Sequence, residues 1–347
     1  MAIQHMDNWT PYGNDQSLLL NGVWADKFLV VLSDPDPVDP SRQALAIAND
    51  GGAGYLRYAM QNTATTCGVA LRMWLDNLPA TDGQYPQPFS FRDATNTIIC
   101  TIGVDNTGRL KVWSGSLGVG GTLLFTTNTP AVTANGFYHL ECKVVISATV
   151  GSIQLRVEGV PVINLTNLNL GTQPVGNFQM QQAQVFRRML IRDFVLWDGA
   201  SSFNNDFLGA CIVYSCTPNA DINTNWTTTN ANRYSVLDNS PPVTGEYIEA
   251  IATPIPPAYL AGLTDLPPDV TSVKCVMTIV KAAKSDGGDG NLQVGLKSGA
   301  TTGLGLDRPI TGAQTYWRDF FATDPNTSAA WAVPAVNAAQ LQINRTT

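Results

Sequence analysis

Two histidines, His5 and His139, are the only imidazole groups with which this 347-residue chain could activate a nucleophile. Serine-type hydrolysis needs a histidine held beside the nucleophile by a third group, and no Gly-x-Ser-x-Gly elbow is present. His5 lies near the start of the chain, and His139 lies on the polar side of a strand-like segment beside Glu141. We therefore interpret both histidines as surface residues rather than catalytic bases.

Glutamates are equally scarce, and the chain has four: Glu141, Glu158, Glu246 and Glu249. Glycoside hydrolysis needs two carboxylates that face each other across a cleft. No segment shows the Glu-x-Asp-x-Glu spacing that would align acids on one strand face, and a separation of three sends Glu246 and Glu249 to opposite faces. The sequence therefore predicts a protein that is not an enzyme.

Asp286 and Asp289, in a glycine-rich stretch, are the weak candidates for a metal site, because carboxylate oxygens bind Ca²⁺. The stretch lacks the length and the terminal glutamate of an EF-hand, so a hairpin tip is the preferred interpretation. Residues 33–40 contain three prolines and are expected to form an exposed loop. No metal site, no cofactor and no catalytic residue is predicted, and the ligand-binding residues are left unknown.

The six cysteines contain no Cys-x-x-Cys pair, which argues against a zinc site. We interpret them as reduced residues of the core, since free cysteine is readily buried and cytoplasmic disulfides are rare. A disulfide between Cys211 and Cys216, across a bend, is the alternative. The six are Cys67, Cys100, Cys142, Cys211, Cys216 and Cys275.

Charged residues make up only 14% of the chain, and the net charge is −7. Affinity for nucleic acid comes mainly from lysine and arginine, and the densest basic cluster here is Arg187-Arg188, so nucleic-acid binding is not expected. The first residues lack a positively charged leader followed by an apolar stretch, and the longest apolar runs are too short to span a bilayer. We therefore expect synthesis in a cytoplasm without a signal peptide and no membrane insertion.

Alternation of apolar and polar residues dominates the chain. Val69, Leu71, Met73 and Leu75 form one apolar row, and residues 98–104 and 140–146 contain others. A period of two places each row on one face of a sheet. Many short strands separated by turns, such as residues 105–108, predict an all-β sandwich. Six tryptophans are assigned to sheet packing rather than to sugar stacking: Trp74, Trp113, Trp197, Trp226, Trp317 and Trp331.

A composition shift near residues 201–205 divides the chain. Residues 1–25 are expected to form an arm or a first edge strand, 26–203 a first sandwich, and 204–347 a second, smaller β-sandwich. No helix of three turns is predicted, and residues 256–263 give one short helical turn at most. Five strands are expected in the second part, within residues 245–252, 273–279, 291–296, 315–321 and 338–343.

Residues 108–201 resemble the concanavalin A-like sandwich superfamily, which includes laminin-G-like and pentraxin-like domains. The resemblance rests on residues 108–113, 121–125, 136–144 and 151–159, and on the closing segment 191–199. It implies a jelly-roll sandwich with a lectin-like fold. Where the family pattern has paired acids in the closing strand, this chain has Arg192-Asp193, which argues against a metal role there.

The continuation resembles a two-part virion structural protein of tailed bacteriophages and of phage-like gene transfer agents. It rests on residues 207–209, 218–220, 238–248 and 336–340. The resemblance implies a non-enzymatic virion component, on tail or head, that contacts other virion proteins, forms homo-oligomers and attaches to a host-surface glycan. The alternative is a non-viral carbohydrate-binding lectin or adhesin.

Overall fold

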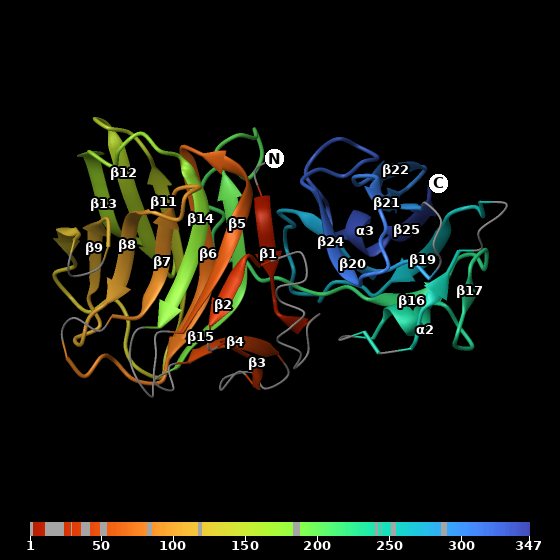
Figure 1. The fold of residues 1–347 in the computed structure, drawn as a ribbon, viewed down its shortest axis with the longest axis horizontal. Coiled ribbons are helices and arrows are strands. Elements are labelled where there is room, and N and C mark those ends of the chain that lie inside the picture. The colour runs from red at the N-terminus through yellow and green to blue at the C-terminus, as the bar shows by residue number, and fades with distance from the viewer. Residues whose placement is uncertain are drawn as a thin grey trace. The chain divides into compact units, whose positions relative to one another are not determined.

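The computed structural model describes residues 3–10, 24–28, 30–35, 42–48, 54–81, 85–116, 120–182, 188–239, 242–243, 245–250, 255–285 and 290–347. The chain divides into two compact units. The first contains residues 1–9 and 14–213, and the second contains residues 10–13 and 214–347. Each unit is built almost entirely of antiparallel strands (Figure 1), which confirms the predicted all-β fold.

The first unit is a sandwich of two sheets. Sheet 1 has the strand order β13 (Val160–Leu168), β12 (Gly151–Val157), β11 (Phe137–Val145), β6 (Thr66–Leu75), β15 (Arg188–Asp198), β4 (Gln43–Ala48) and β3 (Val30–Pro35), and β1 (Ile3–Asp7) also pairs with β15. Sheet 2 has the order β10 (Thr122–Thr126), β9 (Leu110–Ser114), β8 (Ile98–Val104), β7 (Gln87–Arg92), β14 (Val175–Gln182), β5 (Gly54–Ala64) and β2 (Asp26–Phe28).

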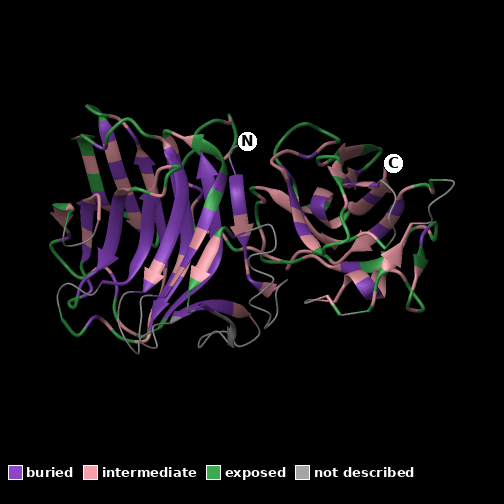
Figure 2. Ribbon diagram, viewed as in Figure 1, coloured by how far each residue is buried: buried purple, intermediate pink, exposed green. Residues whose placement is uncertain are grey.

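The core of the first unit lies between these two sheets, where the predicted apolar rows meet. Phe178 of sheet 2 packs against Phe194 of sheet 1 with ring centroids 5.6 Å apart, and Phe91 meets Phe178 edge-on at 5.4 Å. Leu71, Met73 and the other residues of the predicted rows are buried there. Buried residues dominate the central strands, as Figure 2 shows. Side chains that alternate with these rows must therefore leave the core on the outer faces.

The predicted turn at residues 105–108 joins β8 to β9 and fixes their register. Gly108 has φ +79°, a conformation that glycine adopts without steric cost, and its N–H donates to the Asp105 carbonyl at 3.1 Å. The Asp105 side chain accepts hydrogen bonds from the backbone N–H groups of Thr107 and Arg109 at 2.8 and 3.0 Å. The turn is thus closed by its own side chain.

The second unit contains a six-stranded sheet. Its strands are β16 (Pro218–Asp221), β19 (Tyr259–Leu263), β25 (Gln340–Arg345), β21 (Asn291–Ser298) and β22 (Thr301–Leu304) in that order, with β23 (Arg308–Pro309) paired to β21. Two ribbons accompany the sheet, β17 (Thr227–Thr228) with β18 (Ile248–Glu249), and β20 (Val276–Ala282) with β24 (Thr315–Phe321). Trp226, Tyr259, Val294 and Ile343 form one buried cluster between these elements.

Several local predictions differ from the structure. Residues 33–35 lie in strand β3, although 33–40 was expected to be a loop, and Tyr259–Leu263 is a strand where one helical turn was expected. Two short helices are present in the described residues, α2 (Tyr234–Leu237) and α3 (Val333–Asn337). Residues 3–7, expected to form an arm or a first edge strand, form strand β1 and pair with β15 in sheet 1, and the division between the units falls after residue 213 rather than 203.

Candidate functional site

The outer face of sheet 2 carries a continuous row of polar side chains that crosses six strands. The pairing registers place each member opposite the next: Asp26, Arg57, Gln179, Ser90, Thr101 and Trp113, on β2, β5, β14, β7, β8 and β9. We call these six residues the polar band. Neighbouring strands lie about 4.8 Å apart, so successive residues of the band are separated by about that distance.

One end of the band combines an aromatic pair with a charged pair. Phe28 lies opposite Tyr55, with ring centroids 6.3 Å apart in a stacked arrangement, and Phe28 is 49% exposed. The Asp26 carboxylate accepts hydrogen bonds from the Tyr55 hydroxyl and from Arg57 Nη2, both at 2.9 Å. Burial and the hydrogen bond to Asp26 raise the pKa of Tyr55. The phenol therefore stays protonated and continues to donate to the carboxylate.

The middle of the band is buried. Ser90 and Thr101 are 0% exposed and Gln179 is 4% exposed. Gln179 Nε2 donates to Gln181 Oε1 at 2.9 Å, and Thr101 Oγ1 donates to the Gly115 carbonyl at 3.3 Å. Ser90 Oγ has no hydrogen-bond partner among the residues that the structure describes. A buried polar atom without a partner is uncommon in native proteins and calls for a physical reason.

The far end of the band is closed by aromatic packing. Trp113 is buried and lies 5.1 Å from the Tyr85 ring, centroid to centroid. Lys111 Nζ lies 5.1 Å from the centroid of the same ring and donates to the Tyr85 hydroxyl at 3.2 Å. The predicted packing role is confirmed for Trp113 and also for Trp74, Trp197, Trp226 and Trp331, which are buried as well. The accessible part of the face is therefore the end formed by β2 and β5, which pair with each other, while the neighbouring β14 and β7 are mainly buried (Figure 1).

The outer face of sheet 1 differs, because residues 206–213 of the same unit lie across it. We call this segment the strap. Lys143 Nζ donates to Asp206 at 2.9 Å, and the Arg156 guanidinium lies 3.8 Å from the centroid of the Phe207 ring. Glu141, fully buried, accepts hydrogen bonds from the backbone N–H groups of Leu208 and Gly209. Side chains of β11 and β12 thus hold the first half of the strap.

Asp193 anchors the end of the strap. It sits at a bulge of β15 with φ +50°, is buried, and accepts hydrogen bonds from Arg42 Nη2 and, at 3.0 Å, from the Val213 N–H. The Asn8 side chain donates to the Val213 carbonyl at 3.2 Å. Asp193 therefore has a structural partner for its charge. Close packing continues beside it, since a Cβ at Gly68 would lie 2.2 Å from the Trp197 indole.

Both histidines are buried, and the prediction that they are surface residues is wrong. His5 is 1% exposed, stacks on Tyr58 with centroids 4.6 Å apart, and has Nε2 3.4 Å from Asp7. His139 is 1% exposed, and neither ring nitrogen has a hydrogen-bond partner among the described residues. Burial lowers the pKa of His139. His139 is therefore a neutral, packed side chain.

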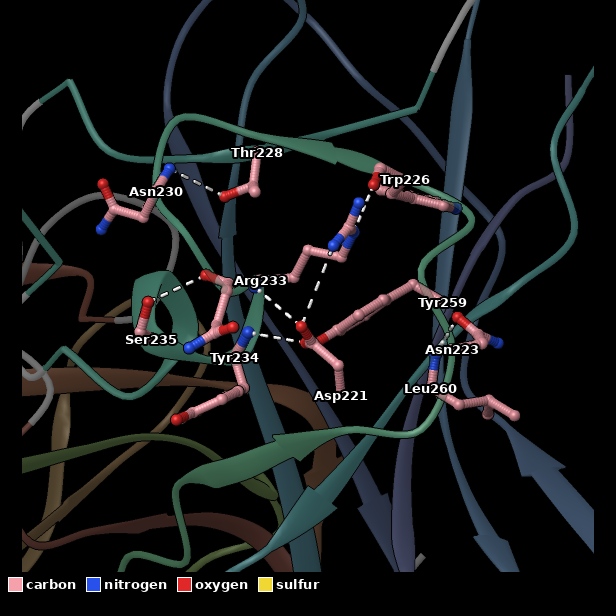
Figure 3. Close-up of polar contacts among 11 residues, drawn as sticks. Asp221, Asn223, Trp226, Thr228, Asn230, Arg233, Tyr234, Ser235, Tyr259 and Leu260 are labelled. Carbon is pink, nitrogen blue, oxygen red and sulfur yellow. Dashed lines mark hydrogen bonds and ion pairs between the residues drawn. The ribbon is translucent and has the colours of Figure 1, made fainter.

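A second polar network lies in the second unit (Figure 3). The Asp221 carboxylate accepts hydrogen bonds from the Tyr259 hydroxyl at 2.7 Å and from the N–H groups of Tyr234 and Arg233 at 2.9 and 3.0 Å. Burial acts to raise the pKa of Asp221, but these hydrogen bonds outweigh it and lower the value. The carboxylate ties helix α2 to strands β16 and β19. We interpret this network as structural, because both of its oxygens are used within the unit.

The other residues selected from the sequence are the two acidic metal candidates and the cysteines. Asp286 and Asp289 lie outside the described residues, and no group of three or more His, Cys, Asp or Glu side chains suited to a metal occurs within them. None of the six cysteines forms a disulfide, so the alternative Cys211–Cys216 bond is not formed; Cys67, Cys100 and Cys142 are buried as predicted, whereas Cys211, Cys216 and Cys275 are half-buried. Burial raises the pKa of Cys100 to about 12. No helix in the described part of the chain is long and apolar enough to cross a membrane.

No family model and no curated protein matches this chain. Solved structures match it at the level of fold. Domain 4 of AbnA, a GH43 extracellular arabinanase from Geobacillus stearothermophilus in complex with arabinotriose, is 11% identical with a TM-score of 0.37, over 57% of this chain and 92% of that one. The alginate lyase Aly36B is 11% identical with a TM-score of 0.35, over 55% and 95%. A sialidase is 10% identical with a TM-score of 0.34, over 46% of this chain and only 15% of its own.

The matched structures describe a lectin-like β-sandwich that carbohydrate-binding and glycan-active domains share. They also correct the prediction that the chain is not an enzyme, because sialidases and an alginate lyase have this fold. That prediction relied on the absence of paired carboxylates. This criterion tests only for glycoside hydrolysis by two acids and not for other reactions on glycans. At 10–16% identity the likeness concerns the fold alone and assigns no activity to this chain.

Proposed function

We propose that the first sandwich is a carbohydrate-binding module whose ligand lies on the outer face of sheet 2. The observation that carries the proposal is the accessible end of the polar band, where the paired Asp26 and Arg57 side chains stand in register beside the stacked Phe28 and Tyr55 rings. Sugars offer hydroxyl groups to such donors and acceptors, and the apolar faces of sugar rings pack on aromatic side chains.

The proposal is tested on a glycan array with the full chain, followed by calorimetry with the strongest ligand. Gln181→Ala removes an amide beside the band, and we expect it to weaken binding about 2- to 10-fold, the net effect of one hydrogen bond. Gln154→Ala is the matched control, because Gln154 is on the outer side of sheet 1 and bonds only to Asn164 in the described contacts. An array without any bound saccharide, or equal losses in the two variants, would contradict the proposal.

The particle, the partners and the oligomeric state of the module stay predictions that rest on the sequence resemblance. The resemblance implies a virion, other virion proteins as partners and a homo-oligomer, and a carbohydrate-binding module suits attachment to a host-surface glycan. Mass spectrometry of purified particles tests the location, and sedimentation of the isolated chain tests the oligomer. A chain that is absent from particles and monomeric in solution would leave the lectin or adhesin alternative.

A further inference from the structure

Asp26 and Arg57 meet through a single contact at the accessible end of the polar band. Arg57 Nη2 lies 2.9 Å from Asp26 Oδ2, and the Tyr55 hydroxyl donates to the same oxygen at 2.9 Å. A guanidinium and a carboxylate that face each other squarely form two parallel bonds instead. The single contact leaves Asp26 Oδ1, Arg57 Nη1 and Arg57 Nε without a hydrogen-bond partner among the described residues. An acceptor and a donor therefore stand unused on neighbouring strands.

These unused atoms are accessible, unlike Ser90 Oγ in the middle of the band. The side chains of Asp26 and Arg57 are 36% and 22% exposed. None of the three atoms is among the buried polar atoms that lack a partner, whereas Ser90 Oγ is. A ligand group that displaces water from such atoms has to replace its hydrogen bonds. The ligand must therefore offer a donor to Asp26 and an acceptor to Arg57.

An apolar surface borders this pair. Phe28 follows Asp26 by two positions on β2, and Tyr55 precedes Arg57 by two positions on β5, so the rings and the charged groups lie on one side of the sheet. The Phe28 ring stacks on Tyr55, and Phe28 stays 49% exposed on β2, the end strand of sheet 2 (Figure 1). Residues two apart on a strand are separated by about 6.7 Å. The exposed ring is thus close to both unused polar groups.

A sugar ring with two neighbouring free hydroxyl groups is complementary to this arrangement. A hydroxyl group both donates and accepts, so one group can donate to Asp26 Oδ1 while its neighbour on the ring accepts from the Arg57 guanidinium. The apolar face of the same ring packs on Phe28. A carboxylate in the same place would satisfy Arg57 but would bring a second negative charge to Asp26. The pair therefore favours two hydroxyl groups over an acidic group.

We propose that this end of sheet 2 binds a saccharide through two adjacent hydroxyl groups of one ring, with Asp26 and Arg57 as the residues that determine specificity and Phe28 as the stacking surface. This inference rests on the proposed function and narrows the ligand to sugars in which two adjacent hydroxyl groups are unsubstituted. Because Asp26 and Arg57 hold each other in place, both polar groups are oriented before the ligand binds, which reduces the entropic cost of binding.

The test uses an array of neutral oligosaccharides that end in glucose, galactose, mannose or arabinose. Each is printed beside analogues whose terminal ring lacks one hydroxyl group at a time, so the apolar face of the ring is kept. We expect the full chain to lose at least about 10-fold in affinity at each of two adjacent positions, since hydrogen bonds to charged groups are strong. Loss of any other hydroxyl group should change the affinity by less than about 3-fold.

Calorimetry with the strongest ligand then assigns the hydroxyl groups to residues. Asp26→Asn is expected to weaken binding of the complete sugar at least about 10-fold. The same variant should bind the analogue that lacks the donating hydroxyl group as it binds the complete sugar, because the two changes remove one contact. Phe28→Ala should weaken the complete sugar and the analogues by the same factor. Asp206→Asn is the matched control, since it changes an ion pair of the same 2.9 Å length on the outer side of sheet 1, and it should bind like the unchanged protein.

The outcomes separate the two proposals. Binding that depends on no pair of adjacent hydroxyl groups would overturn the two-hydroxyl contact and leave the carbohydrate-binding module standing, and so would equal losses in Asp26→Asn and Asp206→Asn. No binding to any saccharide would overturn both. If Asp26→Asn fails to fold, the comparison of each sugar with its analogues on the unchanged protein still decides the question.

Discussion

The outer faces of the two sheets of the first sandwich arise from the same alternation of side chains, but their polar side chains have different partners. On sheet 1 the strap lies across the strands, and the carboxylates of Glu141 and Asp193 accept hydrogen bonds from its backbone. On sheet 2 Ser90 and Arg92 keep buried polar atoms that no described residue satisfies. Alternation therefore predicts which side chains leave the core, but not what they meet outside it.

The strap also shows how buried carboxylates on one outer face obtain hydrogen-bond partners from the same chain. Each buried carboxylate on sheet 1 has backbone N–H donors within reach, and Asp193 has Arg42 as well. On sheet 2 Ser90 Oγ is buried without a partner among the described residues, and on sheet 1 the same holds for both ring nitrogens of His139. The two faces therefore differ in the strap, which covers sheet 1, and in the exposed Phe28 at the end of sheet 2. The following variants test the contacts of the strap on one face and the hydroxyl group without a partner on the other.

The largest effect is expected at Asp193. Asp193→Asn keeps the shape and tolerates the positive φ, but removes the negative charge that pairs with Arg42 and the buried Arg192. Loss of one partner of a buried ion pair costs roughly 3 kcal/mol of unfolding free energy. Denaturant unfolding measures the loss, with Asp206→Asn as the control at the exposed end of the strap. Equal stability of the two variants would contradict the claim that Asp193 anchors the strap.

The second-largest effect is expected at Glu141, whose contribution to stability also depends on pH. Glu141→Ala leaves the Leu208 and Gly209 N–H groups without their acceptor, which costs about 2 kcal/mol. Hydrogen exchange at these two amides measures the loosening directly. Glu141→Gln keeps an oxygen acceptor and is expected to protect both amides as the unchanged protein does. Fast exchange of these amides already in the unchanged protein would contradict the strap contacts.

Burial raises the pKa of Glu141 above 4.5, although the Leu208 and Gly209 N–H groups act in the opposite direction. A carboxyl group with a raised pKa holds its proton more tightly in the folded state, so its ionisation lowers stability as pH rises from 4.5 through the folded-state value. Glu141→Gln lacks this loss. The stability of Glu141→Gln relative to the unchanged protein should therefore increase over that pH range, and a flat difference would show that Glu141 is not desolvated.

Local periodicity predicts much of this fold, because each strand buries its own apolar row. The β8–β9 hairpin follows from alternation and from the residues of its turn, and the expected strand at 315–321 is the observed β24. Strand β19 was missed, because the prolines before it and the glycine inside it weaken the local strand signal. Its pairing with β16 and β25 in the sheet overrides that weakness.

The two outer faces could not be distinguished from the sequence. Glu141 meets Leu208 and Gly209, which lie 67 and 68 positions away, and no local pattern reports such a contact. The polar band depends on the register of six strands, and a bulge shifts that register between Gln179 and Gln181. Alternation placed Glu141 and His139 on the polar side correctly, and the prediction of solvent exposure for His139 failed because the side chain is covered.

Ser90→Ala provides the test on sheet 2. Removal of a buried hydroxyl group that has no partner relieves a desolvation cost, so we expect stability to stay equal or to rise by up to about 1 kcal/mol. Thermal unfolding measures the effect. A clear loss of stability would mean that Ser90 is a structural residue, and the contrast between the faces would disappear.

The smallest effect is expected at Asp206, where the strap is most exposed. The side chain is 68% exposed and pairs with Lys143, so Asp206→Asn should cost less than about 1 kcal/mol at neutral pH. The hydrogen bond from Lys143 lowers the pKa of Asp206 below 3.8, so its contribution is present above that pH and is lost as pH falls through the lowered value. Glu141, which accepts hydrogen bonds from the same strap, has the opposite pH dependence. Salt should remove the effect of Asp206→Asn and leave that of Asp193→Asn, because only the first pair is screened by solvent.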